Sequence, residues 1–414
     1  MEKNEYKPVV SVIIPAYNVE KYISSCLDSV FQQPVYNIEI ICVEDGSADG
    51  TSDIIKKYCN KDNRIRLISN VGNKGTAYAR NRGLEIARGK YVYFLDADDL
   101  IKPQIFTELI KYADENETDC IYFNSELQDE EHIGNLRLHF ELPDLEGKIL
   151  SGTEMFSILM ENNAYTGSVC RQFWRRRFLT DYDIKFSDGL LGEDAEFSVR
   201  AMLSAKRCMC IDKEYHIYRR HGGTMSTNVS PQKAIAMFKI YCRLLEFWNQ
   251  SKFSEEVNGY FDKYMCMRLK QARRLYARNK KFLSEKDFES GSECHLYCRL
   301  LVNADINEAL RLKTDDLIKL RSASEIIVYG AGNYAVDVIE CLNREGILVN
   351  AVAVTKKHSN TVSINGLPVY EIEELEANHK YAAIVLGVKS RENKSDIIEE
   401  LKRRRLFNII NIQN

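Results

Sequence analysis

The chain has 414 residues, of which 45% are hydrophobic and 28% charged, and its formal net charge is −3. This length exceeds one ordinary core and indicates two or three domains. Basic and acidic residues are interspersed, so the charge gives no reason to expect nucleic acid as a partner. Many of the twelve cysteines lie in apolar patterns, as reduced cysteines do. Because the first residues are polar and no window approaches the ~20 apolar residues of a membrane helix, we expect a cytoplasmic protein.

Apolar strand patterns alternate with helical patterns through the first hundred residues. We expect strands at 9–15, 38–43, 65–68 and 91–95, and helices at 19–33, 54–59 and from 75 to just before Gly89. Such alternation is typical of a parallel, doubly wound α/β sheet.

The fourth strand runs directly into Asp96, Ala97, Asp98 and Asp99. Open α/β sheets bind ligands at the carboxyl ends of such strands. Two carboxylates separated by one small residue can hold a divalent cation, which usually completes its coordination with substrate phosphates. The pattern therefore indicates a metal and a nucleotide diphosphate. An alternative is that Asp98 and Asp99 cap the next helix, and Asp99 can cap while the others bind metal.

Two other strand ends should meet the same crevice, at Tyr17-Asn18 and at Glu44-Asp45. Asp45 could accept a hydrogen bond from a base, Tyr17 could pack on a ring, and Arg80 could meet a phosphate. Clustered acids are costly without a cation or hydrogen-bond donors, which favours a ligand here. For each residue singly, a surface turn or helix face remains an alternative.

Four segments, at residues 12–18, 44–51, 73–81 and 96–99, closely resemble in order and spacing the motifs of the family 2 glycosyltransferases. These are inverting enzymes of the GT-A fold. The resemblance implies an α/β, GT-A type nucleotide-sugar-binding domain with a mostly parallel central sheet. We expect this catalytic domain to span residues 1–230.

The resemblance also implies site roles. Asp45 would contact the uracil of a UDP-sugar, Asp96 would lie by the ribose and metal, and Asp98 would ligate Mg²⁺ or Mn²⁺. Glu44 stands where the family usually carries Asp or Asn, so we assign it no direct contact with the nucleotide sugar. The implied nucleotide-sugar site comprises Pro15, Tyr17, Asn18, Asp45, Gly75, Arg80, Asp96 and Ala97, with Arg219, His221 and Ser226 from a later loop.

Residues 187–197 resemble the family's Glu-Asp motif, in which the aspartate is the general base. We carry that role to Asp194, with Glu193 as its neighbour; a simple helix start is the alternative. Just upstream, the basic residues of 174–177 could hold a phosphate or form a solvated turn.

Residues 218–226 resemble the family's lid, which meets the leaving diphosphate. Its basic and hydroxyl residues are separated by Gly222-Gly223, and which of Arg219, His221, Thr224 and Ser226 makes contact is left open. His216 is interpreted as an ordinary strand histidine.

Residues 231–320 are expected to form a helical region. Its basic stretch at 263–281 could lie on anionic lipid or pack on the catalytic domain. Residues 321–414 predict a small Rossmann-like α/β domain, in which Gly330 to Ala335 match a G-x-G-x-x-A turn. The acid that an NAD site needs is missing. Ligand binding, an NAD-dependent activity, and a docking role stay open.

We therefore expect an inverting hexosyltransferase of polysaccharide or glycan biosynthesis, with a nucleotide sugar donor, a glycan or lipid-linked acceptor, and Mg²⁺ or Mn²⁺ as cofactor. Peripheral attachment at the inner face of the membrane and the oligomeric state are left open. The alternative is a non-catalytic nucleotide-sugar-binding scaffold of a glycan assembly complex.

Overall fold

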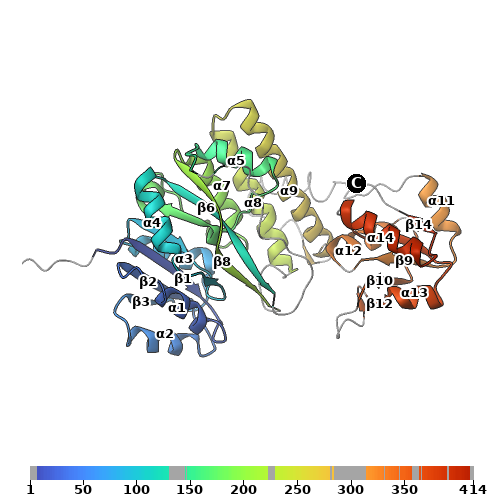
Figure 1. Cartoon of the computed structure of the whole chain (residues 1–414), viewed down its shortest axis with the longest axis horizontal. Coiled ribbons are helices and arrows are strands. Elements are labelled where there is room, and N and C mark those ends of the chain that lie inside the picture. The colour runs from blue at the N-terminus through green and yellow to red at the C-terminus, as the bar shows by residue number, and fades with distance from the viewer. Residues whose placement is uncertain are drawn as a thin grey trace, which may run out of the picture. The chain divides into compact units, whose positions relative to one another are not determined.

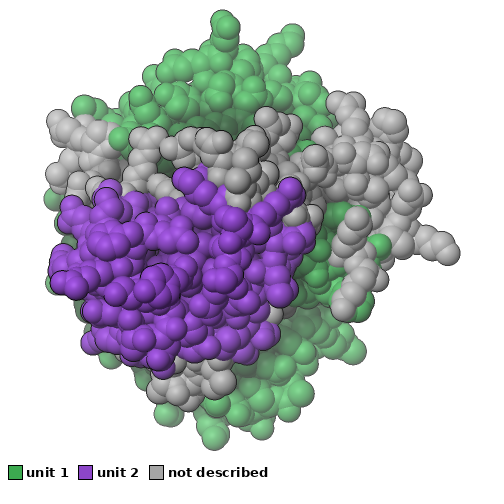
Figure 2. All heavy atoms as spheres, turned by 90° about the vertical axis from the view of Figure 1, so that its right-hand side faces the viewer, with its two compact units in different colours: residues 1–302 green, residues 303–414 purple. Residues whose placement is uncertain are grey.

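The computed structural model divides the chain into two compact units, residues 1–302 and 303–414 (Figure 2). The described residues are 7–129, 145, 147–221, 229–279, 282–283, 314–330, 332–344, 346–356, 363–364, 366–388 and 391–410. Each unit contains its own sheet and is described separately.

The first half of unit 1 alternates strands with helices, as predicted (Figure 1). Its strands are β1 (Val10–Ala16), β2 (Ile38–Glu44), β3 (Ile65–Ser69) and β4 (Tyr91–Phe94), and its helices are α1 (Ile23–Phe31), α2 (Thr51–Cys59) and α3 (Thr76–Ile86). The strands pair in parallel in the order β3-β2-β1-β4. All four carboxyl ends therefore lie at one edge, as expected for an open α/β sheet.

The second half of unit 1 completes an eight-stranded sheet in the order β3-β2-β1-β4-β7-β6-β8-β5. Its elements are β5 (Leu100–Ile101), α4 (Ile105–Asn116), β6 (Cys120–Asp129), α5 (Gly152–Glu161), a 3-10 turn (Val169–Arg171), β7 (Gln172–Arg175), α6 (Arg176–Asp181), α7 (Asp194–Ser204) and β8 (Cys208–Arg220). Four neighbouring pairs are parallel and three antiparallel. The α/β fold with a mostly parallel central sheet is confirmed.

The predicted basic turn at residues 174–177 was wrong. Trp174 lies in β7, which pairs antiparallel with both β4 and β6 in the middle of the sheet. The Trp174 side chain is fully buried, whereas Arg177 of α6 is exposed. A central strand needs apolar side chains, and here Phe173 and Trp174 provide them just before the basic residues.

Alternate residues of the strands pack into cores on the two faces of the sheet. On β1, Val12 faces one core and Ile13 the other. The core that contains Ile13 extends into helices α8 (Pro231–Gln250) and α9 (Glu255–Asn279), through Phe238 and Tyr264 among others. A separate helical region at 231–320 stays a prediction.

Helix α9 carries the predicted basic stretch. Its Tyr264, Leu275 and Tyr276 are buried in the core of unit 1, and the Tyr264 hydroxyl donates to the carbonyl of Ala195 at 3.2 Å. Association with lipid stays a prediction. Within the described ranges, no helix has both the length and the apolar character needed to cross a membrane.

Unit 2 is a smaller α/β layer whose strands follow the order β11-β12-β10-β9-β13-β14. Its elements are α11 (Thr314–Ser322), β9 (Ile326–Tyr329), α12 (Asn333–Arg344), β10 (Ala351–Val354), β11 (Ser363–Ile364), β12 (Leu367–Glu371), α13 (Ile372–Asn378), β13 (Ala383–Leu386), α14 (Arg391–Arg403) and β14 (Ile409–Ile410). Gly330 follows β9 with φ of 132°, and a Cβ there would lie 2.7 Å from the carbonyl oxygen of Gly387. Only glycine fits this turn without strain.

Candidate functional site

The loop after β2 is tied to the start of α3 by Asp45. Its buried carboxylate accepts hydrogen bonds from Asn70 Nδ2 at 2.8 Å, from Lys74 N at 3.0 Å and from Gly75 N at 2.7 Å. These donors hold the glycine loop against the sheet and fix the direction in which α3 leaves it. The expected contact between Asp45 and uracil stays a prediction.

The loop after β1 is fastened to the loop after β2. Asn18 has φ of 52°, its Oδ1 accepts from Ala48 N at 2.8 Å, and its own N–H donates to Ser47 Oγ at 3.1 Å. Pro15 lies in β1, and Tyr17 just beyond it is 45% exposed. An exposed aromatic ring at this edge is available for stacking on a base.

Arg80 of α3 joins the predicted acids from two distant parts of the chain. Its guanidinium pairs with Asp96 Oδ1 at 2.6 Å, with Glu193 Oε1 at 2.8 Å, and with Asp194. Its side chain is only 3% exposed, whereas those of Asp96 and Asp194 are 34% and 25% exposed. The buried cation thus holds two partly exposed carboxylates at the surface of one site.

The ionisation of this cluster is set by burial and by Arg80. Burial opposes the charge of Arg80, but Asp194, Asp96 and Glu193 outweigh it and raise its pKa. Burial raises the pKa of Glu193, and it raises the pKa of Asp194 to about 7 against the opposing effect of Arg80. Asp194 is the first residue of α7, where the helix dipole favours a negative charge.

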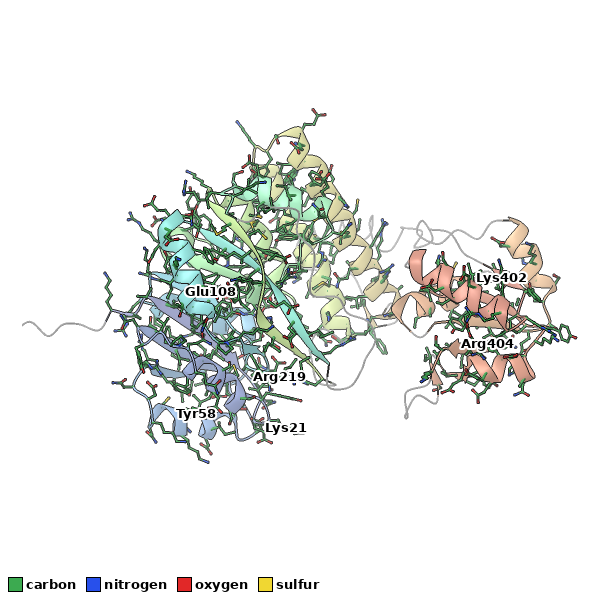
Figure 3. The ribbon with its side chains drawn as sticks, viewed as in Figure 1. Lys21, Tyr58, Glu108, Arg219, Lys402 and Arg404 are labelled. Carbon is green, nitrogen blue, oxygen red and sulfur yellow. The ribbon has the colours of Figure 1, made fainter. Side chains whose placement is uncertain are left out.

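Asp98 lies beside two residues of the predicted lid. The guanidinium Nε of Arg219 donates to the Asp98 carbonyl, and His221 Nε2 lies 3.2 Å from Asp98 Oδ2. Arg219, labelled in Figure 3, and His221 both pack on the ring of Tyr22. Burial, followed by the charges of Asp99 and Asp96, raises the pKa of Asp98 to about 8.

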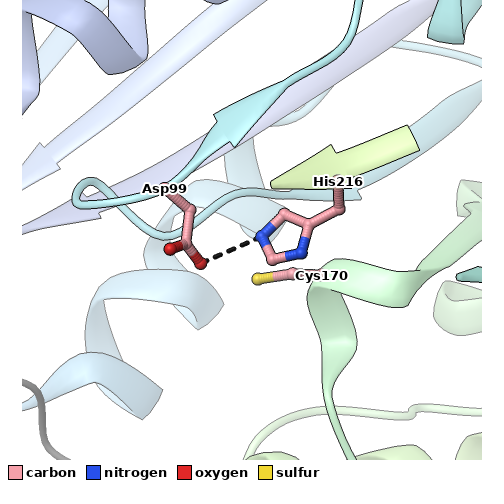
Figure 4. Close-up of side chains that lie close together, drawn as sticks. All are labelled: Asp99, Cys170 and His216. Atoms are coloured by element: carbon pink, nitrogen blue, oxygen red, sulfur yellow. Dashed lines mark hydrogen bonds and ion pairs between the residues drawn. The ribbon is translucent and has the colours of Figure 1, made fainter. Parts of the chain in front are cut away.

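Asp99 does not cap the next helix, so that prediction was wrong. Helix α4 begins at Ile105 without a side-chain cap. The buried Asp99 carboxylate instead pairs with His216 Nε2 at 2.9 Å (Figure 4). It also accepts a hydrogen bond from Arg219 N at 2.9 Å. Sequence reasoning missed His216 as a partner of the site. No local signal marked it, because charged residues such as Glu214 and Arg219 lie close to it in the same strand.

The predicted residues thus fall into connected groups. Arg80 brings together Asp96, Glu193 and Asp194, while Asp98 gathers Arg219 and His221; Ala97 is buried between the two acids. Asp45 is linked to helix α3, which carries Arg80, through Gly75. Ser226 and Thr224 lie outside the described residues.

The chain was compared with known protein families, sequences and structures. Residues 11–176 match the family model described as Glycosyl transferase family 2. The chain is 30% identical over 264 residues to the uncharacterized glycosyltransferase EpsJ of Bacillus subtilis (strain 168), which covers 63% of this chain and 75% of EpsJ.

Glycosyltransferase GlyG of Streptococcus pneumoniae serotype 4 is 27% identical over 222 residues, or 52% of this chain and 72% of GlyG. A crystal structure of S. aureus TarS residues 1–349 in complex with UDP-GlcNAc is 25% identical, with a TM-score of 0.48, over 66% of this chain and 73% of that TarS chain. The family match and the likeness to EpsJ show that the chain belongs to glycosyltransferase family 2.

Proposed function

We propose that this glycosyltransferase moves a sugar from a UDP-sugar to a hydroxyl of a glycan or lipid-linked acceptor, with inversion, in polysaccharide assembly. The observation that carries the proposal is the Arg80 cluster, which sets the predicted base, Asp194, beside the strand-end acid Asp96. An inverting transfer needs a base on one side of the sugar carbon and a diphosphate site on the other.

The strand-end acids fit a divalent cation. Asp96 and Asp98 offer carboxylate oxygens, their side chains are 34% and 27% exposed, and the raised pKa of Asp98 reflects burial together with like charge that a cation would offset. Such oxygens are the ligands that Mg²⁺ and Mn²⁺ prefer. When bound, the ion neutralises charge that develops on the leaving diphosphate.

Asp194 is suited to accept a proton. Its carboxylate is partly exposed, and its pKa of about 7 places it near the pH at which a general base works best. In the proposed reaction Asp194 removes the proton of the acceptor hydroxyl as that oxygen attacks the anomeric carbon. Arg80 holds the carboxylate in place throughout.

In the proposed reaction Arg219 and His221 meet the leaving diphosphate. Arg219 Nη1 donates to Ser25 Oγ at 2.7 Å and Nη2 to the Tyr22 carbonyl at 3.3 Å, which fixes the guanidinium against α1. A preorganised cation beside the Asp98 loop stabilises the negative charge that develops as the diphosphate leaves.

The proposal is tested by nucleotide binding and by transfer. UDP with Mn²⁺, at a hundred times its dissociation constant, should add about 2.7 kcal/mol to the free energy of unfolding of unit 1. Asp194→Asn should bind UDP with Mn²⁺ as the wild type does and lose sugar transfer. Absence of any stabilisation by nucleoside diphosphates with metal, or full transfer activity in Asp194→Asn, would contradict the proposal. An intact fold with binding but no transfer in the wild type would favour a scaffold instead.

A further inference from the structure

The carboxylate of Asp99 connects the loop that carries Asp98 to strand β8. Asp99 Oδ2 lies 2.9 Å from His216 Nε2 (Figure 4). Asp99 Oδ1 accepts a hydrogen bond from the main-chain N–H of Arg219 at 2.9 Å. Both side chains of the pair are at most 3% exposed. They lie too deep to touch substrate, so any part they have in the reaction must act through other residues.

Ser125 of β6 continues the network on the far side of the imidazole. Its buried Oγ lies 2.9 Å from His216 Nδ1. Each ring nitrogen of His216 has a partner, because the Asp99 carboxylate lies at Nε2 and the Ser125 hydroxyl lies at Nδ1. The orientation of the ring is therefore fixed from both sides, and a buried network whose members are all satisfied is rigid.

The network ends at Asp98. The same strand that carries His216 supplies Arg219, which donates to the Asp98 carbonyl, and leads to His221, whose Nε2 lies 3.2 Å from Asp98 Oδ2. Short strand β5 directly follows Asp99 and pairs with β8 at Ile101 and His216. Main-chain pairing holds the two segments side by side, and the Asp99 to His216 bond sets their final position.

We propose that Asp99 and His216, supported by Ser125, are positioning residues that aim the Asp98 carboxylate at the divalent cation of the donor site. This inference rests on the proposed function, in which Asp98 holds that cation. Groups that hydrogen-bond around a metal ligand orient it, and their loss commonly weakens metal affinity by about 10-fold to 100-fold.

Cys170 is the third member of this buried cluster, because its Sγ lies within 4.8 Å of the Asp99 and His216 ligand atoms. The three side chains are of the types that bind Zn²⁺. However, Asp99 and His216 already bond to each other, and the second Asp99 oxygen accepts from Arg219. Burial raises the pKa of the Cys170 thiol, so a metal ion at this cluster would have to displace the thiol proton at a greater cost.

Two substitutions at His216 separate positioning from simple packing. Glutamine carries its amide nitrogen at about the reach of Nε2 and can keep the bond to Asp99, whereas asparagine reaches only as far as Nδ1 and can keep the bond to Ser125. The readout is the dissociation constant of Mn²⁺, measured from the electron paramagnetic resonance of free Mn²⁺ with UDP present. Thermal unfolding is followed in the same samples.

We expect His216→Asn to weaken Mn²⁺ binding by about ten-fold or more, while His216→Gln stays within about three-fold of the wild type. Ser125→Ala removes only the outer bond, as His216→Gln does, and should likewise stay within about three-fold of the wild type. His379→Asn in unit 2, where His379 Nδ1 lies 2.8 Å from Glu325 Oε1, is the matched control and should leave Mn²⁺ binding unchanged.

Equal Mn²⁺ affinities for the two His216 variants, in folded protein, would overturn the inference while leaving the proposed function intact. Stoichiometric Zn²⁺ in the purified wild type that is lost in Cys170→Ser would also overturn it, since the cluster would then be a metal site. A wild type that binds no Mn²⁺ with any nucleoside diphosphate would instead refute the proposed function, and the inference with it.

Discussion

At the scale of single residues, the environment of Asp194 predicts how the reaction depends on pH. A base acts only when ionised, and burial raises the pKa of Asp194 to about 7. As the pH falls through 7 the ionised fraction therefore falls, and kcat at saturating donor and metal should decrease about ten-fold per pH unit below pH 6. Above pH 8, kcat should not change with pH.

The measurement is kcat between pH 5 and 9 for the wild type, with Asp194→Asn as the background rate. A rate that stays level down to pH 5 would show that the base has an ordinary carboxylate pKa, and would contradict this prediction. Saturating metal keeps Asp98, whose pKa is raised to about 8, from limiting the rate.

Arg80 should be essential to stability as well as to function. Replacing it with Met leaves buried Glu193 and the neighbouring Asp96 and Asp194 without their shared cation. Removing one partner of a buried ion pair costs about 3–5 kcal/mol, so the free energy of unfolding in urea should fall by that amount.

The matched control is Lys56→Met. Lys56 pairs with Asp53 on an exposed face of α2, and the two side chains are 59% and 77% exposed. Such pairs contribute about 0–1 kcal/mol. If Arg80→Met were no more destabilising than this control, the carboxylates would have to be neutral in the folded protein.

The acids were readable from the sequence, but their common partner was not. A carboxylate directly after a buried apolar strand is a local signal, and it correctly led to Asp96 and Asp98 at a strand end. Arg80 meets Glu193 more than a hundred positions further along the chain, and Asp99 meets His216 at a similar separation. No local pattern carries such pairings, because they depend on the order of strands across the sheet.

At the scale of elements, the contact between α5 and α7 requires a residue without a side chain. A Cβ on Gly152 would lie 1.7 Å from the Met202 carbonyl oxygen, and Gly152 N donates to the Ala205 carbonyl at 2.9 Å. Backbone cannot yield as a flexible side chain can. Gly152→Ala should therefore lower the free energy of unfolding by at least about 1–3 kcal/mol, as overpacking does.

Gly259→Ala is the matched control, because Gly259 is an exposed position of helix α9 and nothing lies within 4 Å of a Cβ there. Alanine favours the helix there by up to about 1 kcal/mol, so this variant should be as stable as the wild type or more so. Chemical denaturation of both variants measures their free energies of unfolding and tests this prediction. Equal stabilities would show that α5 can move away from α7 at no cost.

The long periodic elements were predictable and the short ones were not. The seven elements from β1 to β4 were expected from their patterns, since alternation of period 2 and helical spacing extend over several residues. Strand β5 has two residues and β7 has four, with Trp174 beside Arg175, so neither offers a pattern long enough to read. Both gain their structure from pairing with longer neighbours.

At the scale of the whole molecule, the two units have separate hydrophobic cores. The cores of unit 1 contain buried residues up to Tyr276, and those of unit 2 begin at Leu320. The sequence indicated this division through a second strand-turn-helix start near Gly330. How far the helical stretch between them belongs to the catalytic domain could not be read, because amphipathic helices show an apolar face but not what covers it.

Separate cores predict that calorimetry of the full chain resolves two unfolding transitions. UDP with Mn²⁺ at a hundred times the dissociation constant should raise the midpoint temperature of the unit 1 transition only, since a ligand stabilises the unit that binds it by about 2.7 kcal/mol at that concentration.

Two variants identify the transitions. Gly152→Ala should lower the midpoint temperature of the unit 1 transition. Gly330→Ala should lower the other one, because the added Cβ would lie 2.7 Å from the Gly387 carbonyl oxygen at a φ of 132°. A single transition that moves as a whole with nucleotide would mean that the units unfold together, and a shift of the transition that responds to Gly330→Ala would place the nucleotide site in unit 2.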